Sequence, residues 1–417
     1  MVELFPLTSE RAKKIVSRLQ SGTCPLEGVV ALNVGREAWF VAADEILDDI
    51  QQVGGAVVRF IRGDYGEGKT HFIAMVRAFA LERNWVTTYV CLSDEVRLDR
   101  FQEVYVAVIN NCVCRAIIEE RRAMVDPGDL DGWRWILDDW VSRQQKLHSR
   151  DLDFGKTATL VVKQRVLDSL NQHLRRANPV GDFSAAVKAY VTHRLDQDWQ
   201  RLEEVLRWFR GENLRLRDRG ILQPVSQANS KQILRSMVSF LRAIGYGGLA
   251  IFLDEVESVV RYPSQKRRSQ AYQNLRELLD NVDGANGMEG ACFYCAAVPE
   301  IFTGERGFRE YEALRERVEP IDSELLHKLA GKPGRIDYRA VVIDLASDPL
   351  TSDDYRKLTR KIRHIHGRAF DWRPELSVTD STLDQLVNDV MTRHRGESGR
   401  LRVLCRAAVQ LLQQSKA

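Results

Sequence analysis

The sequence predicts an α/β protein built around a mostly parallel sheet of five strands. The first observation is that five short segments are apolar and rich in β-branched or aromatic residues, as buried strands are. The second is that amphipathic helical patterns separate these segments, and such alternation favours a parallel sheet with helices on both faces. The predicted strands are Val57–Ile61, Val86–Leu92, Leu249–Leu253, Ala291–Val298 and Ala340–Leu345.

Length and composition agree with a globular protein. The chain of 417 residues is long enough for two or three domains, and its net charge of +3 implies no overall basic surface. No apolar run reaches the roughly 20 residues that span a bilayer, and the N-terminus lacks a signal-peptide pattern. The seven scattered cysteines do not suggest a disulfide framework. We therefore expect a cytoplasmic protein with reduced thiols and no membrane contact.

The first predicted strand is followed by the loop GDYGEGKT and an amphipathic helix. This loop matches the pattern G-x-x-x-x-G-K-[ST] in full. Its glycines let backbone N–H groups turn inward around phosphate oxygens, and the helix adds its positive dipole end. The alternative is a simple glycine-rich turn. We expect Lys69 to bridge the β- and γ-phosphates of ATP and Thr70 to bind Mg²⁺. The predicted nucleotide-binding residues of this stretch are Gly63, Asp64, Tyr65, Gly66, Glu67, Gly68, Lys69, Thr70 and His71.

A long segment separates the second predicted strand from the third. It is rich in helix formers, tryptophan and charge, as in GWRWILDDWVSRQQKL, and it is far longer than a parallel crossover requires. We interpret residues 99–239 as a mostly helical insertion. The core is then formed by residues 51–98 and 240–348, and a helical lead-in of residues 1–50 packs on it.

The third predicted strand ends in Asp254 and Glu255. A carboxylate at the carboxyl end of a buried strand suits a Mg²⁺–nucleotide site at the crevice of an α/β sheet. We expect Asp254 to hold the magnesium shell and Glu255 to orient and polarise the attacking water, which favours hydrolysis over binding alone. The alternative is a solvated turn. In the fourth strand, Cys292 and Cys295 have metal-ligand spacing, but a buried strand favours core packing for both.

Residues 349–417 have the pattern of a small helical domain. Thr351 and Asp354 form a capping-box pattern, and Leu358, Ile362 and Ile365 mark one apolar face of the helix that follows. The closing stretch GRLRVLCRAAVQLLQQ has a second apolar face. Two such faces predict helices that pack against each other.

With these motifs and strands in this order, the chain resembles an AAA+ ATPase of the origin-recognition type. The resemblance implies a P-loop NTPase core, a C-terminal helical lid formed by residues 349–417, and assembly into a homo-oligomer. It also implies an arginine finger that acts in a neighbouring subunit, at Arg317 or alternatively at Arg315. By the same resemblance, Arg402 senses the γ-phosphate and Arg36 helps to seat the nucleotide.

Two positions depart from that family's pattern. The fourth strand ends in Val298-Pro299-Glu300, where the family usually has Asn, Ser or Thr to position the lytic water. Hydrolysis is therefore expected to be slow unless Glu300 or Thr303 substitutes. In the lid pattern that begins at Gly399, Arg400 stands where an acidic residue is usual.

A closer resemblance rests on VGREAWFVAADEILDDI at Val34–Ile50, RFIRGDYGEGKTHF and VIDLASDPLTSDDYRKLTRKIRHIH. These stretches resemble the BrxD family, the ATP-binding proteins of BREX-type phage-defence loci. The resemblance implies a P-loop protein of bacterial defence against phage, with other BREX proteins as partners.

Three segments are locally basic: residues 207–219, 263–270 and 355–373. Such clusters neutralise phosphates without reading sequence, and each is also typical of a solvated helix face. Lys266, Arg267 and Arg268, which we expect in a loop, are the first candidates for double-stranded DNA, because this loop lies next to the hydrolysis machinery of the Asp-Glu strand. Our leading hypothesis is an ATPase that acts on duplex DNA. The competing hypothesis is a nucleotide-gated interaction module that assembles other defence proteins with little hydrolysis.

Overall fold

The computed structural model describes residues 7–25, 28–121, 131–150, 156–280, 287–319, 336–394, 397 and 399–416, without the side chains of residues 119–121 and 156–158. The chain divides into two compact units. The first unit comprises Met1–Ile46, Arg59–Glu82 and Tyr294–Ala417, and the second comprises Leu47–Val58 and Arg83–Phe293.

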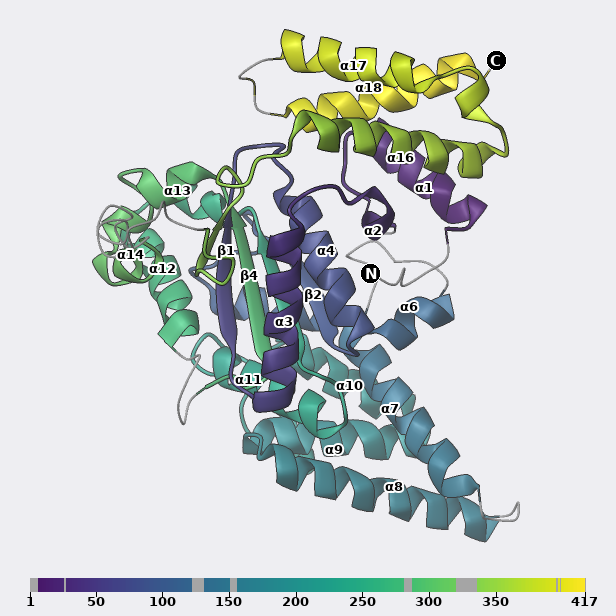
Figure 1. Ribbon diagram of the computed structural model, residues 1–417. Coiled ribbons are helices and arrows are strands. Elements are labelled where there is room, and N and C mark those ends of the chain that lie inside the picture. The colour runs from purple at the N-terminus through teal and green to yellow at the C-terminus, as the bar shows by residue number, and fades with distance from the viewer. Residues whose placement is uncertain are drawn as a thin grey trace. The chain divides into compact units, whose positions relative to one another are not determined.

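A five-stranded sheet has the strand order β2-β3-β4-β1-β5 (Figure 1). In the first unit β5 pairs with β1, and in the second unit β2 pairs with β3, both in parallel. Every residue of β3 and of β4 is buried, which explains their uninterrupted apolar sequences. The predicted α/β class and the five strands are confirmed, with the fifth shorter than expected. The strands are β1 (Val57–Arg62), β2 (Val86–Cys91), β3 (Leu249–Asp254), β4 (Ala291–Ala297) and β5 (Val342–Asp344).

In the first unit, α4 (Lys69–Glu82) follows β1 directly. Each of its residues from Phe72 to Leu81 is buried. Phe40 of α3 (Glu37–Val53) packs on α4, with its ring centroid 5.0 Å from that of Phe72. Since α4 is buried along most of its length, its first turn and the loop before it have a fixed place in the unit.

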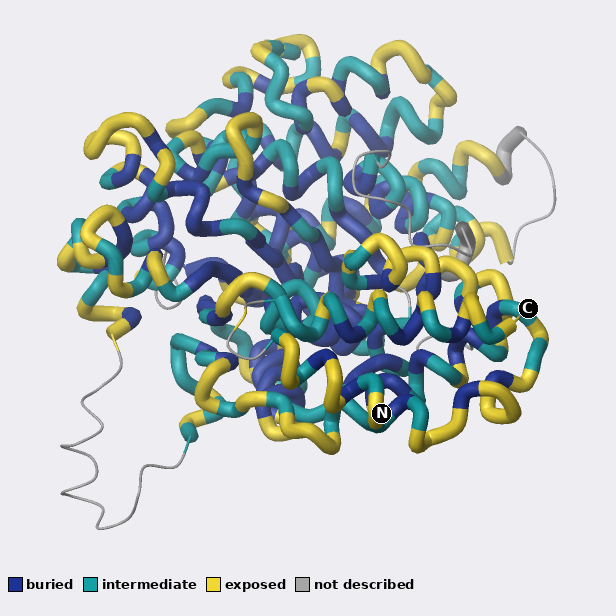
Figure 2. Tube along the Cα trace, turned by 90° about the horizontal axis from the view of Figure 1, so that it is seen from above, coloured by how far each residue is buried: buried dark blue, intermediate teal, exposed yellow. Residues whose placement is uncertain are grey.

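The C-terminal helices of the first unit are α16 (Ser352–Phe370), α17 (Asp380–Arg393) and α18 (Arg400–Ser415). The predicted capping box at the start of α16 is confirmed. Helix α1 (Ser9–Gln20) packs against α16 and α18 and shares their apolar core, whereas α3 packs on α4 (Figure 1). Buried and exposed stretches alternate along these helices, as expected of amphipathic segments (Figure 2).

The second unit contains the helices of the predicted insertion and those next to β3. Four aromatic side chains from four helices, Trp133, Phe183, Phe209 and Phe240, form its centre, and the centroid of Trp133 lies 5.7–6.3 Å from the other three. This cluster explains the high aromatic content of the segment. The helices are α5 (Phe101–Asn110), α6 (Arg115–Arg121), α7 (Gly132–Ser149), α8 (Lys156–Ala177), α9 (Gly181–Leu195), α10 (Trp199–Phe209), α11 (Ser230–Ala243) and α12 (Gln265–Asp280).

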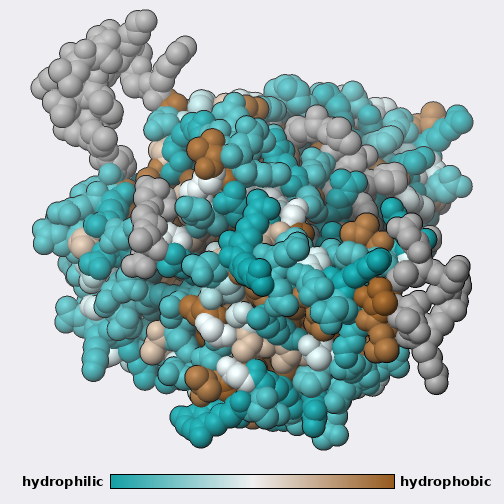
Figure 3. All heavy atoms as spheres, turned by 90° about the horizontal axis from the view of Figure 1, so that it is seen from below, coloured by the Kyte–Doolittle hydropathy of each residue, from teal (hydrophilic) through white to brown (hydrophobic). Residues whose placement is uncertain are grey.

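The surface drawn in Figure 3 is mostly hydrophilic, with hydrophobic side chains in small separate groups. Large exposed hydrophobic residues of the second unit are Val53, Leu147, Leu160, Trp199 and Leu222. Among the described residues, no helix has both the length and the apolar character needed to cross a membrane. Cys292 and Cys295 are fully buried in β4, as core packing predicts.

Candidate functional site

The loop Gly63–Thr70, called the phosphate loop from here on, connects β1 to α4. Gly66 and Gly68 have φ values of +81° and +100°, which residues with a side chain rarely adopt. The N–H of Gly63 donates to the carbonyl of Ala297 at 3.3 Å and ties the start of the loop to the end of β4. Glycine is therefore required at positions 66 and 68 by the backbone itself.

Lys69 is the first residue of α4, and its side chain turns back into the phosphate loop. Its Nζ donates to the carbonyl oxygens of Gly63 at 2.8 Å and Asp64 at 3.2 Å. It also lies 5.2 Å from the ring centroid of Tyr65. The side chain is only 9% exposed, and a buried ammonium group requires such acceptors. The positive charge is thus held inside the loop, where it can meet a phosphate.

Arg36 supports the phosphate loop through the main chain. Its guanidinium donates to the carbonyl oxygens of Glu67 at 2.9 Å, Leu345 at 3.3 Å and Asp348 at 3.2 Å. Burial lowers the pKa of Arg36, while the carboxylates of Glu67 and Asp348 act in the opposite direction. We expected this arginine beside a nucleotide. The structure brings it to the phosphate loop, where it holds the segment after β5 and the loop together.

The carboxylate of Glu67 folds back onto the beginning of the phosphate loop. Its Oε2 accepts the N–H of Asp64 at 2.8 Å. A Cβ at Gly63 would lie 3.0 Å from the same oxygen. Glycine at position 63 therefore leaves room for this internal brace of the loop.

His71 links the phosphate loop to the C-terminal helices. Its Nε2 lies 3.3 Å from Oδ1 of Asn33, and the carbonyl of Asn33 accepts a hydrogen bond from Nζ of Lys361 on α16. Burial lowers the pKa of His71 to about 4, and the positive charges of Arg36 and Lys361 add to this effect. The imidazole is therefore neutral near pH 7. Nε2 carries the proton in this pairing, because Oδ1 of Asn33 only accepts.

The start of α18 also reaches the phosphate loop. A Cβ at Gly66 would lie 2.4 Å from the Cα of Gly399, the residue before α18. The close approach therefore requires glycine at position 66, whereas a Cβ at Gly399 would meet no atom within 4 Å. The phosphate loop is thus in direct contact with the C-terminal helices of its own unit.

Asp254 and Glu255 lie in the second unit at the end of β3. Asp254 is 4% exposed, and its carboxylate accepts the N–H of Glu255 at Oδ1 (2.9 Å) and the hydroxyl of Tyr89 at Oδ2 (2.8 Å). Glu255 has a φ of 58°, a left-handed conformation that is costly for a residue with a side chain. Sequence reasoning did not single out Tyr89 as a partner of Asp254. Its only sequence signal was a polar group near the end of a predicted buried strand.

The residues present fit a magnesium-bound nucleotide. Gly66 and Gly68 form a cradle that side chains would fill, Lys69 supplies a buried positive charge, and α4 begins at the loop. Thr70, in the first turn of α4, and Asp254, at the end of β3 in the second unit, each carry an oxygen of the kind that Mg²⁺ prefers. Among the described residues, no group of three or more His, Cys, Asp and Glu side chains could hold a metal. A P-loop site does not need one, because Mg²⁺ usually keeps several waters and substrate phosphates as ligands.

The predicted arginines occupy different places. Arg317 is exposed on α14 (Glu312–Val318), and its Nη1 donates to the carbonyl of Ala313. Arg315 pairs with Glu312 and Glu319 of the same helix region. Arg402 is exposed one turn into α18, and a Cβ at Gly22 would lie 3.1 Å from its Cγ. The stem of Arg402 therefore lies against Gly22, while Gly399 faces the phosphate loop.

The end of β4 also differs from the expected pattern in sequence. Glu300 is exposed in the first turn of α13 (Pro299–Thr303), whereas the hydroxyl of Thr303 donates to the carbonyl of Pro299 at 3.3 Å. Of the two residues that could replace a polar strand end, Glu300 is the one whose side chain has the greater freedom.

The structure corrects the first candidate for DNA contact. Lys266, Arg267 and Arg268 lie on the first turn of α12 and not in a loop. Arg268 is 8% exposed and donates to the carbonyl of Tyr262 at 3.0 Å, so it is not available to a phosphate. Lys266 and Arg267 are exposed.

The other two basic segments are largely neutralised within the fold. On α16, Arg356 and Arg360 pair with Asp384, and Arg363 pairs with Asp380, both acids lying on α17. In the segment 207–219, Arg207, Arg210 and Arg219 pair with Glu212, Glu203 and Glu204 respectively. The pairs on α16 join that helix to α17, whereas Arg207 and Arg210 pair with acids of α10 or of the turn after it. Such pairing is the ordinary alternative for basic segments.

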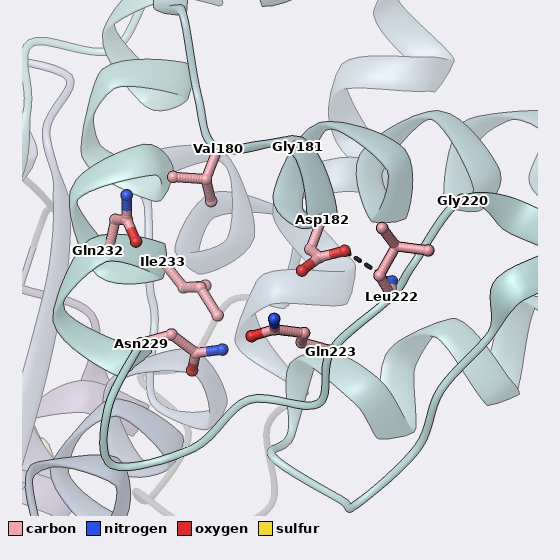
Figure 4. A pocket seen from close by; sticks show the side chains of 9 residues that line it. All are labelled: Val180, Gly181, Asp182, Gly220, Leu222, Gln223, Asn229, Gln232 and Ile233. Carbon is pink, nitrogen blue, oxygen red and sulfur yellow. Dashed lines mark hydrogen bonds between the residues drawn. The ribbon is translucent and has the colours of Figure 1, made fainter.

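A cavity of about 320 Å³ lies within the second unit, between the starts of α9 and α11 (Figure 4). The side chain of Asp182 turns toward the neighbouring chain segment, where it accepts the N–H of Leu222 at 2.7 Å. The cavity contains none of the predicted site residues. We therefore assign it no part in nucleotide binding.

The α/β fold and the phosphate loop together define a P-loop nucleotide-binding protein. The chain belongs to the family described as BREX system ATP-binding protein BrxC/D, whose family model matches residues 7–416. No curated protein matches the chain in sequence. The expected membership in a family of phage-defence ATP-binding proteins is thus confirmed.

Proposed function

We propose that this protein is an AAA+-type ATPase that binds and hydrolyses ATP with Mg²⁺ and acts on double-stranded DNA in BREX phage defence. The observation that carries the proposal is the phosphate loop, with Lys69 buried inside it and two glycines in positive-φ conformations. Membership in an ATP-binding family of the BREX system supports ATP as the ligand. In this proposal α16–α18 form the lid, and the approach of Gly399 to Gly66 supports that role.

The residues of the chain have distinct tasks in this proposal. Lys69 exchanges the carbonyls of Gly63 and Asp64 for oxygens of the β- and γ-phosphates. Thr70 and Asp254 hold Mg²⁺, which when bound supplies positive charge beside the phosphates. The assignment of Asp254 rests on its buried carboxylate at the carboxyl end of β3, the usual place of such a ligand in α/β proteins.

Hydrolysis requires a group that orients water, and we assign this task to Glu255. Its left-handed backbone is the kind of local strain that functional sites carry. Glu300 is the further candidate for positioning the water. In an oligomer, Arg317, or alternatively Arg315, would act on the nucleotide of a neighbouring subunit. Arg402 remains the candidate sensor on α18.

The proposed DNA contact rests on two exposed basic side chains. Lys266 and Arg267 are the exposed members of the first candidate group. Their contacts would be to phosphates, so binding would weaken steeply with salt. The substitution Lys266→Ala combined with Arg267→Ala should reduce DNA-stimulated turnover and leave basal turnover unchanged.

A second candidate function is a nucleotide-gated module that assembles other defence proteins. The end of β4 favours it, because Val298-Pro299-Glu300 offers no Asn, Ser or Thr to position a lytic water, and the hydroxyl of Thr303 is bound to Pro299. In such a module, nucleotide binding would hold α18 on the phosphate loop without turnover.

Turnover of Glu255→Gln decides between the two functions. A hydrolase should lose nearly all phosphate release in this variant, because general-base and water-orienting groups contribute about 10²–10⁴-fold. Glu305→Gln, at an exposed position after α13, is the control and should retain full turnover. The measurement is phosphate release with and without duplex DNA. Absence of turnover in the unaltered protein, with tight ATP binding retained, would leave the gated module as the function.

A further inference from the structure

We propose that Tyr89 is a positioning residue that orients the Asp254 carboxylate for the divalent cation that accompanies the nucleotide. The inference rests on the proposed function, since it assumes that Asp254 serves the cation. It adds a residue that no motif identifies, on a strand other than the one that carries Asp254.

The two side chains meet on one face of the β2–β3 pair. The register places Cys91 opposite Asp254 and Tyr89 opposite Phe252. Side chains two residues apart on a strand lie on the same face, so Tyr89 shares the face of Cys91 and Asp254. From there its hydroxyl reaches along the strands and donates to Oδ2 of Asp254 at 2.8 Å.

This hydrogen bond fixes the rotation of the carboxylate. Oδ1 of Asp254 accepts the N–H of Glu255 at 2.9 Å, and Oδ2 accepts the hydroxyl of Tyr89, so each oxygen has an assigned donor. A carboxylate that is 4% exposed cannot turn freely, and its charge needs such donors. The two donors come from different elements, and together they leave the carboxylate a single orientation.

The donor itself is held in place. Nδ2 of Asn111 donates to the carbonyl of Tyr89 at 3.3 Å, and β2 pairs with β3 over its whole length.

Removing a hydrogen-bond donor to a metal-ligating side chain typically lowers metal affinity by about 10–100-fold. Without the hydroxyl, Oδ2 of Asp254 loses this donor, and the carboxylate is held less firmly in the orientation that a cation requires. The opposite effect is expected if the phenol competes with the cation for Oδ2, because its removal would then tighten cation binding. The sign of the change therefore tests the role.

The test compares Tyr89→Phe with Tyr190→Phe in the full chain. Tyr190 is a matched control, since it also lies in the second unit and donates to an aspartate, Asp138, at 2.8 Å. The probe is Mn²⁺, whose binding to the protein saturated with ATPγS is followed by electron paramagnetic resonance. ATPγS affinity in excess EDTA is measured by calorimetry on the same samples and reports on folding of the site.

In Tyr89→Phe we expect the half-saturating Mn²⁺ concentration to rise about tenfold or more, with metal-free ATPγS affinity changed less than about twofold. Tyr190→Phe should match the unaltered protein in both measurements. Unchanged or tighter Mn²⁺ binding in Tyr89→Phe overturns the inference, and so does an equal rise in Tyr190→Phe. Failure of the unaltered protein to take up ATPγS would instead overturn the proposed function, so the two failures are distinguishable.

Discussion

The phosphate loop and the end of β3 are built in different ways. In the phosphate loop the decisive groups are backbone amides and carbonyls, and Lys69 bonds to carbonyls five and six residues before it. At the end of β3 the decisive groups are side chains, and the partner of Asp254 lies 165 positions away in the sequence. A site made from local backbone can be recognised from a short motif. A site made from side chains of two strands depends on their register, which no short motif records.

The largest expected loss of nucleotide affinity follows from substitution of Lys69, the one charged side chain held inside the phosphate loop. Lys69→Ala removes a buried positive charge that no other residue of the loop replaces. We expect ATPγS affinity to fall by about 100-fold or more, since charge-assisted bonds to phosphate are among the strongest polar contacts. Calorimetric titration measures this. Lys188→Ala, at an exposed position on α9, is the control and should bind normally. Equal affinity in the two variants would mean that the loop does not bind the triphosphate through Lys69.

The next effect concerns backbone conformation. Gly66→Ala introduces a Cβ where φ is +81° and where the Cα of Gly399 would lie 2.4 Å away. The left-handed conformation costs about 1–2 kcal/mol, and the overlap adds about 1–3 kcal/mol unless α18 moves. We expect a lower free energy of unfolding in urea and ATPγS affinity reduced about tenfold. Gly181→Ala is the matched control, because a Cβ at Gly181 meets no atom within 4 Å and its φ is ordinary. The same loss in both variants would contradict a specific contact between the loop and α18.

Sequence reasoning succeeded for features built from neighbouring residues and failed for those built by tertiary packing. The five strands, the capping box at Thr351 and the phosphate loop were all predicted, because each depends on residues within one or two turns of each other. Arg36 was predicted near the site from family resemblance. Two of its actual partners, the carbonyls of Leu345 and Asp348, lie 309 and 312 positions later in the sequence and could not be foreseen.

In the basic segments, the sequence suggested binding surfaces that tertiary packing removes. Charge counted along α16 suggested a phosphate-binding face, but the compensating acids Asp380 and Asp384 lie on the next helix. Arg268 is buried because its position falls on the inner face of α12, a fact that depends on where this helix begins. Tyr89 was missed for the same reason, since only the register of β2 with β3 places it beside Asp254. Local charge predicts little when its partners are set by tertiary packing.

The smallest expected effect concerns pH, and it distinguishes the two regions once more. Burial and the charge of Asp254 raise the pKa of Tyr89, so its hydroxyl stays protonated at neutral pH. His71, next to the phosphate loop, instead has a pKa of about 4, against an ordinary value of 6.5. Between about pH 4 and pH 6.5, His71 therefore binds a proton in the unfolded state but not in the folded state. The contribution of His71 to stability is complete above pH 6.5 and is lost as the pH falls from there toward 4, at about 1.4 kcal/mol per pKa unit.

Unfolding in urea at pH 7.5 and pH 5.5 measures this contribution. The unaltered protein should lose on the order of 1 kcal/mol more between the two pH values than His71→Asn does. His366, whose pKa burial also lowers to about 4, contributes equally to both proteins and cancels in the difference. His364→Asn, at an exposed position on α16, should behave as the unaltered protein does. An identical pH dependence in all three proteins would show that burial, together with the charges of Arg36 and Lys361, does not lower the pKa of His71.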